Sequence, residues 1–121
     1  MKKQNYKKIA RDVIELEINA LKKLKKSISN SFADAVDAIV KCQSKVILCG
    51  VGKSGLIAAK ISSTLSSVGT SSFSLSASDC SHGDLGSISK KDVLILISYS
   101  GSTEELKNIT LQVILVQNSK L

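Results

Sequence analysis

Residues 45 to 55 read KVILCGVGKSG, and this stretch predicts how the chain folds. It begins with a short β-branched run, Val46 to Leu48, which indicates a strand that ends at closely spaced glycines. Apolar residues then recur at helical spacing through Ile57, Ile61 and Leu65. A strand, a tight turn and a helix in this order form the repeating unit of parallel α/β sheets.

Three further segments extend this unit into a sheet. Residues 73–75 form a weaker strand, and residues 93–97 form a strong one that is apolar on both faces, as buried parallel strands are. Residues 113–116 begin a fourth. We therefore predict an α/β fold whose parallel strands at 46–49, 73–75, 93–98 and 113–116 are covered by helices on both faces.

The first 44 residues predict a helical pair ahead of the sheet. Apolar side chains such as Ile9, Val13 and Leu16 recur every three or four positions through residue 28. Ser31 and Asp34 form an N-capping pattern for a second helix that ends near residue 42. We divide the chain into these helices, 1–44, and a sheet domain, 45–121. Because a small domain leaves much of the first helix uncovered, we expect a homo-oligomer that covers its apolar stripe.

Charge and composition exclude several classes of function. The net charge is +7, but residues 1–26 hold nine basic against three acidic side chains, which leaves only +1 for the other 95 residues. The chain has only two Tyr and two Phe, too few to interleave with these basic residues as RNA and single-stranded DNA binding requires, so we expect no nucleic-acid partner. The longest apolar run, 93–97, is too short to span a bilayer, and the residues after Met1 are not a secretory signal. We expect a cytoplasmic protein without a membrane partner.

The cysteines favour the same compartment. The chain has three, at Cys42, Cys49 and Cys80, with no CxxC pair, and all lie near apolar segments. An odd number without such spacing argues against a disulfide framework and against a thiolate zinc site. We expect reduced, partly buried thiols.

The segment GVGKSG, residues 50–55, matches the GxGxxG pattern between a strand and a helix. Backbone amides and the helix dipole attract phosphate at such a position. The segment is not a Walker A loop, because Ile47 occupies the place of the first glycine. A structural turn, a dinucleotide site and another kind of phosphate site all remain open on this pattern alone.

A second loop, SYSGST at residues 98–103, follows the strong third strand. Its hydroxyls, amides and glycine form a second anion cradle at the carboxyl edge of the same sheet. Ser102 and Glu105 also match an N-capping box, and both interpretations can hold together. A phosphate held in this way suits a small phosphorylated metabolite better than a dinucleotide, which needs a long groove.

The chain's one histidine, His82, lies in the segment SHGDLG at residues 81–86. A lone histidine is commonly structural or simply exposed. Here the segment leaves the carboxyl edge of a predicted strand, which favours contact with a ligand. Asp84 could orient His82 or form the following turn.

Taken together, GVGKSG, SHGDLG and SYSGSTEEL, in this order, resemble the sugar isomerase (SIS) domain of arabinose-5-phosphate isomerases. The resemblance covers about residues 46–106 and implies a flavodoxin-like sheet, of which 45–121 is an incomplete part. It also implies interconversion of D-arabinose 5-phosphate and D-ribulose 5-phosphate, which feeds synthesis of the octulosonic acid of lipopolysaccharide or capsule. The expected partner is thus a small phosphosugar.

The resemblance also implies roles for individual residues. Lys53 corresponds to the catalytic-site lysine, His82 to a substrate-contacting histidine and Glu105 to an acid of the active site, although Glu105 can instead be a cap. Aldose-ketose isomerisation needs a base and a group that stabilises the enediol oxyanion. The residues expected to bind substrate are Ser54, Gly69, Thr70, His82, Ser98, Ser100 and Thr103.

Two departures from the family pattern limit this transfer. Ser76 and Ala77 stand where the family commonly has a histidine and a proline taken to bind a metal, so we expect no metal, and no cofactor is expected either. The family also places a further glutamate and histidine after the point where this chain stops, Leu121, and often adds CBS domains. We therefore expect weak or no turnover by the chain alone. The alternatives are a non-catalytic phosphosugar-binding SIS module and, less favoured, a dinucleotide-binding oxidoreductase.

Overall fold

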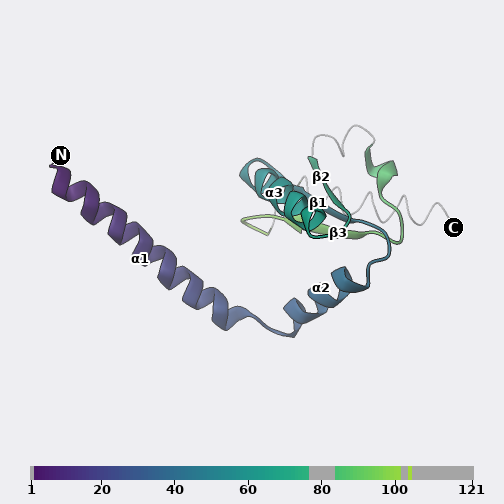
Figure 1. Cartoon of the computed structure of the whole chain (residues 1–121), viewed down its shortest axis with the longest axis horizontal. Helices are drawn as coiled ribbons and strands as arrows, with labels where there is room; N and C mark the ends of the chain where they lie inside the picture. The colour runs from purple at the N-terminus through teal and green to yellow at the C-terminus, as the bar shows by residue number, and fades with distance from the viewer. Residues whose placement is uncertain (1, 77–83, 102–103, 105–121) are drawn as a thin grey trace. The chain divides into compact units, whose positions relative to one another are not determined.

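The computed structural model describes residues 2–76, 84–101 and 104 (Figure 1). The chain divides into two compact units, Met1–Asp37 and Ala38–Leu121, and the boundary falls inside the second helix. The predicted strand at 113–116 lies outside the described residues, as do His82, Thr103 and Glu105.

Two helices open the chain, as predicted. Helix α1 is Lys3–Ser27, and its last turn carries Lys25 and Lys26, whose charges suit the negative end of the helix dipole. Helix α2 is Asn30–Lys41. The prediction that Ser31 caps α2 was wrong, because Ser31 lies inside the helix and the residue before the helix is Ser29, two positions earlier. The carbonyl of Ser29 already accepts from the amide of Phe32 at 3.1 Å, while the Ser31 hydroxyl pairs with that of Ser29 at 2.9 Å.

The second unit contains a parallel sheet of three described strands in the order β2-β1-β3. They are β1, Val46–Gly50, β2, Ser72–Ser76, and β3, Val93–Ile97, which confirms the three predicted strands within the described residues. Helix α3, Lys53–Ser67, connects β1 to β2 and packs along them (Figure 1). Strand β1 lies between the other two described strands, and this position buries its whole apolar run.

The core lies on both faces of β1. Val46 and Leu48 pack with Ala58 of α3 on one face, where Ile39 and Leu65 add to the contact. Alternate residues of the strand point the other way. There Ile47 and Cys49 are fully buried with Ile88, which follows the 3-10 helix η1, Asp84–Ser87. A parallel sheet flanked by helices is therefore confirmed.

Two glycines allow α3 to begin directly against the end of β1. A Cβ atom on Gly50 would lie 2.6 Å from the carbonyl carbon of Ser54, and one on Gly55 would lie 2.9 Å from the carbonyl oxygen of Gly50. Gly52, between them, has a φ of 59°, which side chains rarely adopt. Each glycine of the GxGxxG segment thus has a structural reason, whatever the loop binds.

Asp92 aligns β1 with β3 at the opposite, amino edge of the sheet. Its side chain is fully buried, and its carboxylate accepts from Lys45 Nζ at 2.8 Å, Ser44 Oγ at 2.6 Å and the Ser89 amide at 2.7 Å. Burial opposes ionisation, but these hydrogen bonds and one from the Lys45 amide outweigh it. The pKa of Asp92 is therefore held well below its ordinary value of 3.8.

Asp92→Asn should destabilise the fold by about 2–4 kcal/mol, because the amide group turns a donor towards Lys45 or the Ser89 amide. The pKa of Asp92 is lower in the folded than in the unfolded chain, so its contribution is complete above pH 3.8 and declines as the pH falls. Urea unfolding at several pH values measures both effects. The exposed Asp34→Asn serves as the control, and equal stability of both variants would contradict the role of Asp92.

Candidate functional site

The carboxyl ends of β1 and β3 lie side by side, because Gly50 is paired in register with Ile97. The chain leaves β1 through α3 towards β2 on one side, while β3 adjoins β1 on the other. Such a reversal of strand order opens a crevice outside the carboxyl ends of the strands, where open α/β sheets bind ligands. The loops after β1 and β3 border this crevice.

The glycine loop, residues 50–55, brings the start of α3 to the crevice. Lys53 is the first residue of the helix and is exposed, and Ser54 beside it is half-buried. The N-cap, Gly52, has no side chain, and the first turn of α3 carries no acidic residue. The positive end of this 15-residue helix is therefore not neutralised by its own first turn, which favours a bound anion.

The hydroxyl loop is the segment 98–103 after β3, and its described part, residues 98–101, folds back on itself. The Ser98 hydroxyl accepts a hydrogen bond from the Gly101 amide at 3.0 Å, and Gly101 has a φ of 71°, a conformation that suits glycine. Ser98 is half-buried, whereas Ser100 at the tip is exposed. The structure thus brings four of the expected site residues to one edge of the sheet: Lys53, Ser54, Ser98 and Ser100.

Gly69 and Thr70 do not join them within one chain. They follow the carboxyl end of α3, where Gly69 has a φ of 97° and the Thr70 amide donates to the carbonyl of Leu65 at 2.9 Å, which is a helix-ending turn. The 15 residues of α3, about 22 Å of helix, separate this turn from Lys53. The position of this turn at the amino edge could be predicted from the order of elements, because a turn that leads from a helix into a parallel strand lies at the amino end of that strand.

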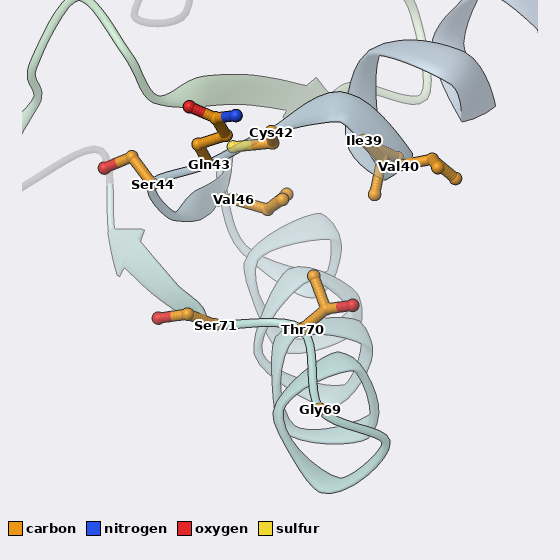
Figure 2. Close-up of a pocket in the computed structure, with 9 residues that line it drawn as sticks. All are labelled: Ile39, Val40, Cys42, Gln43, Ser44, Val46, Gly69, Thr70 and Ser71. Atoms are coloured by element: carbon orange, nitrogen blue, oxygen red, sulfur yellow. The ribbon is translucent and has the colours of Figure 1, made fainter.

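At that edge Gly69 and Thr70 line a cavity of about 470 Å³. Figure 2 shows residues of the end of α2 and of the segment 42–46 on one side of the hollow, and the turn 69–71 on the other. Its lining combines apolar side chains, among them Ile39 and Val40, with the hydroxyls of Ser44, Thr70 and Ser71.

Two serines that sequence reasoning missed lie at the carboxyl edge. Ser74 and Ser76 of β2 line a pocket of about 350 Å³ together with Gly50, Gly52 and Gly55. The alternation SFSLS of β2 was the available signal, since Phe73 and Leu75 pack in the core on one face and place the serines on the other.

The described residues contain no group of three or more His, Cys, Asp or Glu side chains that could hold a metal ion. Cys49 is a buried thiol and Cys42 a half-buried one, as predicted, while Cys80 lies outside the described residues. Among the helices that the structure describes, none is long and apolar enough to span a membrane.

Comparison with known proteins agrees with this architecture. The SIS domain family model matches residues 39–118. The protein named "Probable arabinose 5-phosphate isomerase" in Haemophilus influenzae is 39% identical over 98% of this chain and 37% of its own length. "Arabinose 5-phosphate isomerase GutQ" of Salmonella typhi is 42% identical over 79% of this chain and 30% of its own length.

A solved structure shows the same fold. It is c3406 of E. coli CFT073 in complex with arabinose 5-phosphate, which superposes with a TM-score of 0.84 at 38% identity, over 90% of this chain and 58% of that one. The chain spans about a third of the length of the two curated relatives. Because the family model matches about two thirds of its residues, this chain belongs to the SIS domain family.

Proposed function

We propose that this chain supplies the phosphosugar-binding part of an isomerase that interconverts D-arabinose 5-phosphate and D-ribulose 5-phosphate. The observation that carries the proposal is the meeting of the glycine loop and the hydroxyl loop at the carboxyl edge of β1 and β3. The names of the H. influenzae and S. typhi relatives support this reaction, and the arabinose 5-phosphate complex of c3406 supports this substrate.

The phosphate is bound at the start of α3 and by the hydroxyl loop. Amide groups of the first helical turn and the hydroxyls of Ser54, Ser98 and Ser100 are its donors. Thr103 completes the hydroxyl loop in this proposal. Because the dipole of α3 and the hydroxyls act without a metal, phosphate binding requires none.

Lys53 acts on the sugar rather than on the phosphate. Its ammonium, at the exposed start of α3, stabilises the negative charge that develops on the enediol oxygen during isomerisation. Moving the proton between adjacent carbons requires a base, and Glu105 is the candidate for it, with His82 as a further contact to the substrate. Gly69 and Thr70 lie at the amino edge of the sheet, away from the crevice of their own chain. In this proposal they contact substrate only in the crevice of a second copy of the chain.

A non-catalytic phosphosugar-binding module is the second candidate, and the same crevice supports it. The two candidates predict the same binding and differ only in turnover. Membership of the SIS domain family disfavours the dinucleotide-binding oxidoreductase. The division into helices, 1–44, and a sheet domain, 45–121, and a cytoplasmic location remain parts of the proposal.

Ser100→Ala should weaken binding of arabinose 5-phosphate by about tenfold, because one hydrogen bond to a charged phosphate is lost. Calorimetry on the 121-residue chain measures this affinity. Ser63→Ala, at an exposed position in the middle of α3, is the matched control. If the two variants bind arabinose 5-phosphate with equal affinity, the hydroxyl loop is not part of the binding site.

A polypeptide of these 121 residues should turn over arabinose 5-phosphate at least about a thousandfold more slowly than a full-length relative. The physical reason is that it spans about a third of the relatives' length, so groups that position the substrate and exclude water are missing from it. An assay for ribulose 5-phosphate, with Lys53→Ala as the control for contaminating enzyme, measures the rate. Turnover near that of a complete enzyme that Lys53→Ala abolishes would contradict this expectation.

The chain should form a homo-oligomer through the apolar stripe of α1, because a stripe that recurs along 25 residues requires cover from water. Light scattering at micromolar concentration should give a molar mass that corresponds to more than one copy of the chain. Leu16→Gln combined with Leu24→Gln should shift the chain towards the monomer. Lys22→Gln combined with Lys26→Gln, on the polar face, should not. A stable monomer of the unaltered chain would refute the proposal.

A further inference from the structure

A second pocket at the amino edge of the sheet gathers positive charge away from the phosphosugar crevice. Its volume is about 410 Å³, and it belongs entirely to the unit Ala38–Leu121. Its lining comes from the end of α2 and from the turn before β3, and the residues are Ala38, Lys41, Cys42, Gln43, Lys90, Lys91, Asp92 and Val93.

Lysines concentrate at this edge although residues 27–121 as a whole are nearly neutral. Residues 27–121 have a net charge of only +1, yet four of the eight lysines of residues 38–121 lie at this edge, namely Lys41, Lys45, Lys90 and Lys91. Lys90 and Lys91 are exposed, and neither side chain has a carboxylate partner among the described residues.

Asp92, the one acidic residue among the described residues that line the pocket, does not offset this charge. The Asp92 carboxylate is fully buried and is already paired with Lys45 at 2.8 Å and with Ser44 and the Ser89 amide. Within the described part of the chain, an anion that enters the pocket therefore meets the ammonium groups of Lys90 and Lys91 rather than a competing carboxylate. The network also fixes the turn that carries Lys90 and Lys91, because the Asp92 amide donates to the Ser89 carbonyl at 3.1 Å.

We infer that this pocket is a second anion site, which takes the phosphate group of a small ligand. The lysines bind the phosphate as point charges, and the neighbouring cavity of about 470 Å³ has room for the uncharged part of such a ligand. The two cavities share Cys42 and Gln43, so they adjoin one another. The five residues of β1, about 15 Å, separate this edge from the phosphosugar crevice. Both sites can therefore be occupied at the same time.

The test is a titration of the isotope-labelled 121-residue chain with pyrophosphate, in the presence of saturating arabinose 5-phosphate, followed by amide chemical shifts. Pyrophosphate should shift the amides of residues 41–43 and 89–93. Lys90→Gln combined with Lys91→Gln should weaken this binding at least about fivefold, and added salt should weaken it further. The exposed Lys60→Gln, on α3, is the matched control and should leave the affinity unchanged.

Three results would overturn the inference. The first is shifts confined to residues 52–54 and 98–101, which would mean that pyrophosphate uses only the phosphosugar crevice. The second is unchanged affinity in the Lys90 and Lys91 double variant. The third is an equal loss in Lys60→Gln, which would indicate an adventitious ion only. Arabinose 5-phosphate binding is measured separately, by the shifts of residues 52–54 and 98–101 when this sugar phosphate is added before pyrophosphate.

Discussion

The structure depends on the close approach between the end of β1 and the first turn of α3. Backbone of Ser54 and Gly55 lies where a side chain on Gly50 would be, so this approach requires glycine on the strand. It places the positive end of the α3 dipole at the carboxyl edge of the central strand. The exposed Lys53 and the half-buried Ser54 then reach the crevice because the helix begins there. One packing constraint thus forms both the βαβ unit and the anion-binding end of its helix.

The amino edge of the sheet is fixed by different chemistry. There the buried Asp92 joins the segment before β1 to the turn before β3 through Lys45, Ser44 and Ser89. This network sets β3 beside β1 in the register that pairs Val46 with Val93. The same register brings Ile97 opposite Gly50, and with it the hydroxyl loop beside the glycine loop. The geometry of the crevice is therefore determined in part at the edge of the sheet that does not bind the phosphosugar.

Much of the fold could be predicted because its strands are short apolar runs bounded by turn residues. Strand β1 is the clearest case, since all its residues are buried and its pattern is continuous. The start of α2 could not be placed from one capping pattern, because Ser29 and Ser31 are both plausible caps and local hydrogen bonds decide between them. The Asp92 network was not predicted either. Its partners lie up to 48 residues apart in sequence, and no local pattern reports that separation. For the site, the common edge of Lys53 and Ser98 followed from strand order, whereas the serines of β2 depended on which face of the sheet the core occupies.

The most direct measurement for the central claim is a crystal structure of the chain with arabinose 5-phosphate bound. We expect the phosphate to lie within hydrogen-bond distance of amides at the start of α3 and of the Ser98 or Ser100 hydroxyl, with the sugar towards Lys53. A phosphate bound only at the amino edge, near Thr70 or Lys90, with none at the glycine loop, would contradict this claim.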